Sequence, residues 1–184
     1  MNYKMFVLSI WNVLDPIGHA ARQLTYVDRE GSNIFRVKLI CFKGQEMALQ
    51  DGSLIKKNDL LLKIHLDNLS LLKELIPLSS DFKKGKVLVK WIERSLPSVY
   101  RYVLTHDKTA DIKGIIGLTM LYPGSHHLGF ETLDVSNRLY RDFKWLSFMP
   151  IHFLSVSHPL KSCRKNMPKY LYMSMEQLAK RYGD

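Results

Sequence analysis

A two-residue alternation of apolar and charged side chains between residues 33 and 42 constrains the fold of this chain more than any other feature of its sequence. Phe35, Val37, Leu39 and Cys41 are apolar, and basic side chains stand between the first three of them. Successive side chains of a β-strand point to opposite faces, so this pattern is typical of a half-buried strand.

The residues that follow predict a short antiparallel meander. Met47 and Leu49 continue the alternation, and Asp51-Gly52 is a strong hairpin signal. A further apolar run covers residues 60–66. A later run, residues 114–121, is uncharged and rich in β-branched side chains, which favours a central strand.

Other segments repeat their apolar residues with the period of a helix. We predict helices over residues 1–15, 16–24, 69–76, 86–104 and 134–143, and a last helix that starts near residue 168. In the last one, Leu171, Met175 and Leu178 recur at i, i+4 and i+7. Asp67 or Asn68 is placed to cap the helix over 69–76.

These elements predict one α+β domain over residues 1–184, with a small, mainly antiparallel sheet packed against several amphipathic helices. The sequence contains no internal repeat, low-complexity tract or linker. The 184 residues are enough to bury a sizeable core.

The excess positive charge is confined to two segments. The chain has 27 Lys and Arg against 17 Asp and Glu, a formal net charge of +10. Residues 83–101 hold six basic side chains against one acidic, and residues 138–184 hold nine against three.

If residues 86–104 are helical, the first segment sorts into two faces. The apolar side consists of Leu88, Ile92, Leu96, Val99 and Val103, and the other side is a basic stripe of Lys83, Lys86, Lys90, Arg94 and Arg101. Pro97 predicts a kink or a break near Ser95. The stripe either solvates a surface helix or binds an anionic partner: a lipid surface, a glycan-linked phosphate or a nucleic acid.

A histidine on the predicted strand 60–66 is the centre of a candidate catalytic site. Lys63, His65 and Asp67 share the face opposite the core, and a carboxylate beside a histidine suits a general base. A histidine that is simply hydrogen-bonded at a strand end is the alternative. The candidate catalytic set is His65, Asp67, Asn68, His126 and Glu131.

The sequence lacks the motifs of several common kinds of metal site and enzyme. The spacing of these histidines fits no established zinc motif, and the common nucleotide-binding and hydrolase motifs are absent, so we expect neither a metal nor another cofactor. Cys41 and Cys163 cannot form a disulfide framework, and we expect free thiols in a reducing compartment, with Cys41 buried. The apolar stretches are too short or too interrupted to cross a bilayer, so we expect a cytoplasmic protein without a transmembrane segment.

Five short motifs resemble one family. They are Asp28-Arg29-Glu30-Gly31-Ser32-Asn33-Ile34-Phe35-Arg36-Val37, Asp51-Gly52-Ser53 with Asn58-Asp59, Ile64-His65-Leu66 with Asn68, Gly117-x-Thr119-x-Leu121, and Leu128-Gly129-Phe130-Glu131. Together they resemble the YkoP-like proteins of bacilli, over about residues 10 to 155. Segments related to this family occur attached to polysaccharide deacetylase domains, so the resemblance implies a cell-envelope context and a carbohydrate or lipid-linked glycan ligand. It identifies no catalytic residue.

The first functional hypothesis is a non-enzymatic binding or accessory domain that meets an anionic or glycan-bearing partner, at the inner face of the membrane in one version. In that version, the N-terminal apolar stretch and residues 145–148 lie on lipid. The alternatives are a hydrolase or transferase centred on His65, and a nucleic-acid-binding protein. The sequence predicts no oligomeric state.

Overall fold

The computed structural model describes residues 24–27, 33–155 and 167–183. The helices predicted over residues 1–15 and from residue 16 onward, and the Cys163 thiol, lie outside these residues. The family resemblance in residues 28–32 lies outside them as well.

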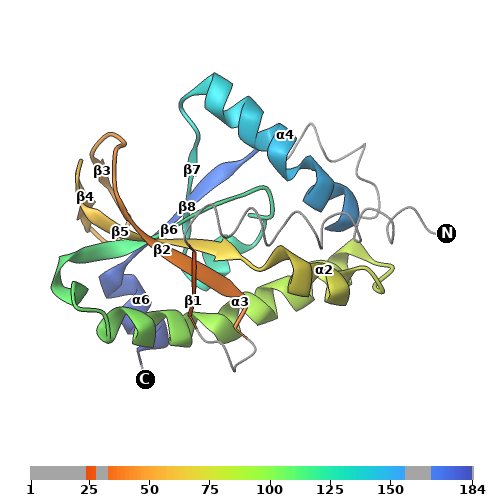
Figure 1. Ribbon diagram of the computed structural model, residues 1–184, viewed down its shortest axis with the longest axis horizontal. Coiled ribbons are helices and arrows are strands. Elements are labelled where there is room, and N and C mark those ends of the chain that lie inside the picture. Colours follow the sequence, from red (N-terminus) through yellow and green to blue (C-terminus); the bar gives the residue numbers. More distant parts are fainter. Residues whose placement is uncertain (1–23, 28–32, 156–166, 184) are drawn as a thin grey trace.

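A six-stranded mixed sheet forms the centre of the described fold, in the order β1-β2-β5-β6-β8-β7 (Figure 1). Its strands are β1 (Thr25–Tyr26), β2 (Phe35–Cys41), β5 (Leu60–Leu66), β6 (Ile112–Thr119), β7 (Glu131–Asp134) and β8 (Lys169–Ser174). Strands β5 and β6 are parallel, and every other neighbouring pair is antiparallel. The predicted fold class, α+β with a mainly antiparallel sheet, is confirmed.

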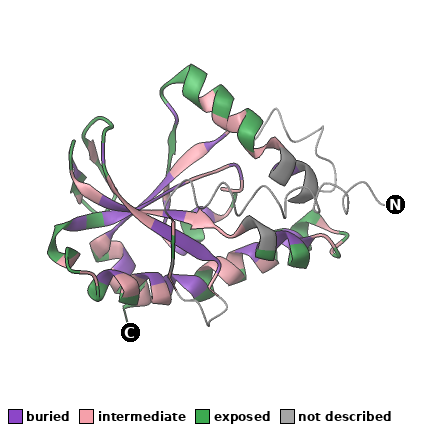
Figure 2. Cartoon of the chain, viewed as in Figure 1, coloured by how far each residue is buried: buried purple, intermediate pink, exposed green. Residues whose placement is uncertain are grey.

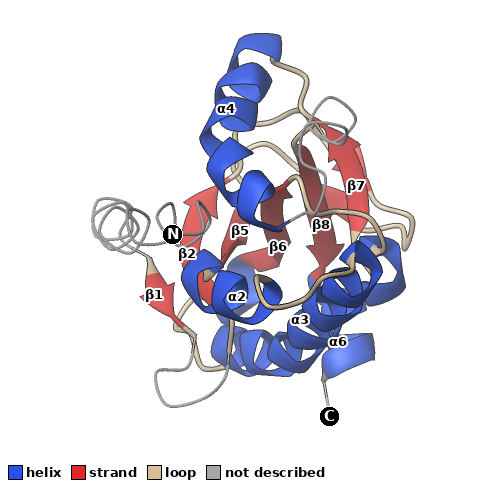
Figure 3. Cartoon of the chain, turned by 90° about the vertical axis from the view of Figure 1, so that its right-hand side faces the viewer, coloured by secondary structure: helices blue, strands red, loops and turns tan. Residues whose placement is uncertain are grey.

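The helices lie on both sides of this sheet. They are α2 (Asn68–Leu75), α3 (Asp81–Leu104), α4 (Arg138–Ser155) and α6 (Met175–Tyr182), with short 3-10 helices η1 (Thr109–Asp111) and η2 (Ser125–Leu128). Figures 1 and 3 show α3 and α6 together on one side and α4 on the other.

The main core lies between the sheet and α3 with α6. Val37, Leu62 and Ile115 of the sheet pack against Val99 of α3 and Leu178 of α6, and all five side chains are fully buried. Figure 2 shows this purple layer along the sheet and the inner side of α3. The predicted alternation of β2 thus places its apolar side chains in the core.

The predicted meander is wrong in its order of strands. Strand β2 pairs directly with β5 over seven residues, while β3 (Met47–Ala48) and β4 (Leu54–Ile55) form a separate two-stranded sheet. The seven-residue register offers far more backbone hydrogen bonds than the two-residue hairpin strands do. The hairpin instead covers the second face of the sheet, where Leu49 and Ile55 pack with Tyr172.

The predicted last helix begins too early. Residues 169–174 are strand β8, and α6 starts only at Met175. Strand β8 is central, so Leu171 and Met173 face one core while Tyr172 packs in the other. A strand buried on both faces shows no polar alternation, and its leucine matched a helical period by coincidence. Ser174 caps α6 by accepting a hydrogen bond from the Gln177 N–H at 2.9 Å.

Three further predictions need correction. The helix predicted over residues 134–143 begins at Arg138 and extends to Ser155, because residues 131–134 form the edge strand β7. Helix α3 runs without interruption through Pro97, so of the two predicted alternatives near Ser95 the break is absent, and the kink stays a prediction. Cys41 is exposed, since it lies at the end of β2 where the core layer stops.

Pro97 has no backbone N–H, so α3 lacks one helical hydrogen bond at this position. Tertiary contacts hold this part of α3 to the sheet. The Ser95 Oγ accepts a hydrogen bond from the Ile34 N–H at 3.2 Å, and the Ser95 carbonyl accepts one from Asn33 Nδ2 at 3.0 Å. These contacts link residues about sixty positions apart, which local sequence patterns do not report.

Candidate functional site

His65 lines a cavity of about 100 Å³ at the carboxyl ends of the parallel strands β5 and β6. The two strands contribute His65 and Thr119, α3 contributes Ile92, and α4 contributes Phe148 and His152. Helices from opposite sides of the sheet therefore meet at these strand ends (Figure 1). The cavity lies at the end of the strands and not over one face.

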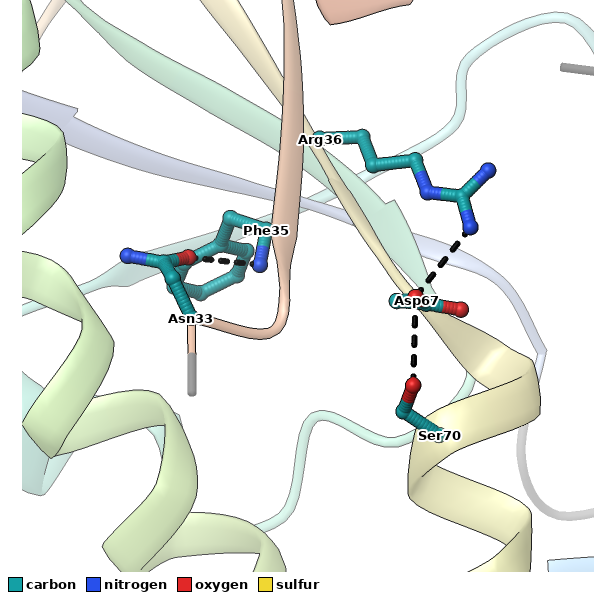
Figure 4. A network of polar contacts seen from close by, with 5 residues as sticks. All are labelled: Asn33, Phe35, Arg36, Asp67 and Ser70. Carbon is teal, nitrogen blue, oxygen red and sulfur yellow. Dashed lines mark hydrogen bonds and ion pairs between the residues drawn. The ribbon is translucent and has the colours of Figure 1, made fainter. Parts of the chain in front are cut away.

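A buried ion pair lies beside His65. The Arg36 guanidinium contacts the Asp67 carboxylate at 3.1 Å, and the two side chains are only 9% and 13% exposed. Ser70 Oγ donates a hydrogen bond to the same carboxylate oxygen at 3.2 Å, as Figure 4 shows. Asp67 precedes α2 but makes no side-chain capping bond, so its carboxylate is used for the ion pair instead.

Basic side chains cluster on one face of β2 and β5. Arg36 is directly opposite His65 in the antiparallel register, and Lys38 is directly opposite Lys63. Arg36 is buried, and the other three are partly buried. In β5, Leu62 and Ile64 are buried in the main core while Lys63 and His65 are partly buried, and Leu61, on the face of Lys63 and His65, is buried in the second core. Asn68 is the first residue of α2.

His152 is a second histidine in the same cavity, and the sequence analysis did not select it. It is 1% exposed, and burial lowers its pKa, while the nearby Asp81 carboxylate opposes that shift. The imidazole is therefore neutral at pH 7, able to donate through one nitrogen and accept through the other. The signal in the sequence is a lone histidine that interrupts an apolar stretch, residues 145–156.

His126 and Glu131 line a different and wider cavity, of about 510 Å³, beside the β3–β4 hairpin. The Glu131 Oε1 accepts a hydrogen bond from the Gln50 N–H at 2.7 Å. The His126 ring lies 3.9 Å from the ring of His127, between centroids. The five predicted catalytic residues are thus divided between two places in the fold, and a single centre that uses all five stays a prediction.

Three of the residues that line this wider cavity, Asp51, Ser174 and Gln177, are joined by hydrogen bonds. Ser174 Oγ donates to Asp51 and accepts from the Gln177 N–H. Burial alone raises the pKa of Asp51, but hydrogen bonds from Ser174 and Ser53 outweigh it and hold the pKa below its usual value. Asp51 therefore stays a carboxylate at neutral pH, anchored to the start of α6.

The predicted basic stripe lies on the outer side of α3. Lys83, Lys86, Lys90, Arg94 and Arg101 are all exposed, while Leu88, Leu96, Val99 and Val103 of the opposite side are buried. Ile92 is partly buried. The two faces were therefore predicted correctly. Lys84 is a buried neighbour of the stripe and lies 3.8 Å from Asp81.

Helix α4 carries an apolar ridge on its exposed side, which shares Leu146 with residues 145–148, the stretch predicted to lie on lipid. Leu139, Phe143 and Leu146 are 85%, 63% and 65% exposed. Trp145 and Phe148 of the predicted lipid-facing stretch are partly buried. In the parts of the chain that the structure describes, no helix is long and apolar enough to span a bilayer. Nor do these parts bring three or more His, Cys, Asp or Glu side chains together as a metal site would need.

The YkoP domain family matches residues 4–182. This chain belongs to the YkoP family. The uncharacterized protein YkoP of Bacillus subtilis (strain 168) is 40% identical over 179 residues, which cover 97% of each chain. No solved structure matches.

Several motifs that carried the resemblance to the YkoP family lie at the two cavities. Ile64, His65 and Leu66 line the first cavity, together with Gly117, Thr119 and Leu121. Gly129 and Glu131 line the second, and Phe130 lines both. The name of the relative assigns no activity.

Proposed function

We propose that this YkoP-family chain is a non-enzymatic binding or accessory domain that meets an anionic partner through the basic stripe of α3, in a cell-envelope context. The observation that carries the proposal is the exposure of all five predicted cations along one helix. The stripe runs from Lys83 to Arg101, about 27 Å along the axis of α3, so it matches an extended row of phosphate groups.

The electrostatics support a phosphate-bearing surface. Near an anionic surface, each Lys or Arg contributes about 1 kcal/mol, and the contribution falls off within a Debye length of about 8 Å at physiological salt. Two carboxylates, Asp81 and Glu93, lie on the same helix and reduce the gain. Binding should therefore weaken steeply with added salt.

A comparison of three anionic probes tests the proposal. The full chain is mixed with vesicles that contain anionic lipid, with a poly(glycerol phosphate) polymer and with duplex DNA, at low and at physiological salt. We expect binding to vesicles or to the polymer that salt weakens. Preference for DNA supports the nucleic-acid alternative, and no binding to any probe at low salt contradicts the proposal.

A matched pair of variants separates the stripe from net charge alone. One variant changes Lys83, Lys86, Lys90, Arg94 and Arg101 to Gln. The control changes five exposed lysines elsewhere to Gln: Lys56, Lys57, Lys73, Lys108 and Lys180. Both lose five charges, but we expect only the first to lose most of its affinity, by about a factor of ten or more. Equal losses mean that the stripe has no special role.

The second candidate function is a hydrolase or transferase that uses His65. The observation that favours it is that His65 and His152 line one cavity at the carboxyl ends of β5 and β6. A general base must lie within hydrogen-bond reach of the proton that it takes from the substrate. The Asp67 carboxylate already contacts Arg36 and Ser70. Turnover of ester or glycosyl substrates that His65→Ala abolishes, with His126→Ala active, supports this candidate.

A further inference from the structure

The cavity at the ends of β5 and β6 has the setting of a small-molecule site. The chain leaves the carboxyl end of β5 into α2, and it leaves β6 through a turn into η2. Ligands commonly bind outside the carboxyl ends of parallel strands at the point where the connections diverge. Both α3 and α4 close this space, so a ligand would be held on two sides.

The walls are mainly apolar, and the volume is small. Leu118, Met120, Phe130, Phe148 and Leu171 supply hydrocarbon and aromatic surface. An apolar cavity of about 150 Å³ holds one benzene molecule. By proportion, the cavity of about 100 Å³ takes about four non-hydrogen atoms, which is enough for the hydrocarbon chain of a small ligand, so the oxygen atoms of its head group would lie at the mouth of the cavity.

Three polar side chains interrupt these walls: His65, Thr119 and His152. The Thr119 Oγ accepts a hydrogen bond from the Leu121 N–H at 2.9 Å, which leaves the hydroxyl proton as a donor. Each imidazole can also donate. The polar part of the cavity therefore suits a head group that accepts several hydrogen bonds.

The charge beside His65 favours an anionic head group. Arg36, Lys38 and Lys63 share a face of β2 and β5 with His65, and Asp67 is the carboxylate that pairs with Arg36. On the His152 side, the Asp81 carboxylate lies near the imidazole and contacts Lys84 at 3.8 Å. Four cations against two carboxylates make the local potential positive, whatever contacts each cation makes. A neutral ligand gains nothing from this field.

We infer that this cavity binds a short-chain monocarboxylate, with the carboxylate beside His65 and an acyl chain of about four carbons against Phe148 and Leu118. The inference is independent of the basic stripe, because the cavity and the stripe share no residue.

Calorimetric titration of the full chain with butanoate tests the inference. We expect saturable binding with a Kd of about 1 mM, as befits a ligand of few atoms. 1-Butanol has the same chain without the charge and should bind about tenfold more weakly or not at all. Acetate and octanoate should also bind more weakly than butanoate. No saturable binding of butanoate, or equal binding of butanol, overturns the inference.

A matched pair of histidine variants locates the site. His65→Gln removes the imidazole from the cavity, while His126→Gln removes one that lines the other cavity. We expect butanoate affinity to fall about tenfold in the first variant and to stay unchanged in the second. Equal affinities in the two variants contradict the placement.

A second variant, which changes the size of the cavity, tests the inference even if His65→Gln does not fold. Phe148→Ala enlarges the cavity from the α4 side, so hexanoate or octanoate should overtake butanoate in affinity. An unchanged preference for chain length overturns the inference. The five-residue stripe variant should bind butanoate normally, so failure of the proposed function and failure of this inference are distinguishable.

Discussion

The Arg36 guanidinium and the Asp67 carboxylate form an ion pair at 3.1 Å that joins the residue between β5 and α2 to strand β2 (Figure 4). Both side chains are largely withdrawn from water. The Asp67 N–H also donates to the Ile34 carbonyl, so the backbone is held at the same place. The contact fixes the geometry of the strand end next to His65.

Removal of one member of this pair should be costly. Asp67→Ala leaves a buried guanidinium without its carboxylate, and we expect a loss of about 3 kcal/mol in the free energy of unfolding. Asp134→Ala is the control, because its ion pair with Lys169 has the same 3.1 Å distance but Asp134 is 84% exposed. The control should cost less than about 1 kcal/mol. Urea unfolding measures both, and equal losses would falsify the assigned role of burial.

The Ser95 hydroxyl should contribute to stability through its bond to the sheet. Ser95→Ala leaves the buried Ile34 N–H without its acceptor, and we expect a cost of about 1 to 3 kcal/mol. Ser98→Ala removes a hydroxyl of the same helix that accepts from the exposed Arg101 at 3.2 Å. It should change stability by less than about 0.5 kcal/mol. Thermal unfolding that ranks the two variants the other way contradicts the prediction.

Two glycines should respond to alanine in opposite directions. A Cβ at Gly114 would lie 2.5 Å from the Met173 carbonyl oxygen on the neighbouring strand β8, so Gly114→Ala should destabilise by about 2 kcal/mol. A Cβ at Gly85 of α3 would meet nothing within 4 Å. Gly85→Ala should therefore stabilise the helix by about 0.5 to 1 kcal/mol. Melting temperatures of the two single variants check both signs.

The buried His152 should make stability depend on pH in mildly acidic solution. Burial lowers its pKa in the folded chain, so the unfolded chain takes up the proton first as the pH falls below about 6.5. The contribution of the neutral imidazole to the free energy of unfolding is therefore complete above about pH 6.5. It is lost as the pH falls toward the lowered pKa of the folded chain. In urea unfolding from pH 8 to pH 5, His152→Gln should show a shallower loss of stability than the parent chain. His126→Gln, whose histidine is exposed, should retain the parent slope.

Part of the candidate site could be predicted from local patterns. The alternation in residues 60–66 placed His65 on the face opposite Ile64, and the helical period of α3 separated its cations from Leu96 and Val99. His152 could not be selected in this way. A lone histidine in an apolar stretch carries no sign of the strand end that it will meet, and α4 reaches that end only through tertiary packing.

The sequence by itself determined the elements whose side chains repeat with a regular period, namely β2, β5, α2 and α3, because hydrophobic burial acts on each face of a strand or helix independently of its partner. Only the tertiary structure decided that β2 pairs with β5, that β8 is a strand, and that Arg36 meets Asp67. Those outcomes depend on contacts between distant residues. Such contacts depend on the free energy of the whole packed core, and a short segment of sequence does not contain that information.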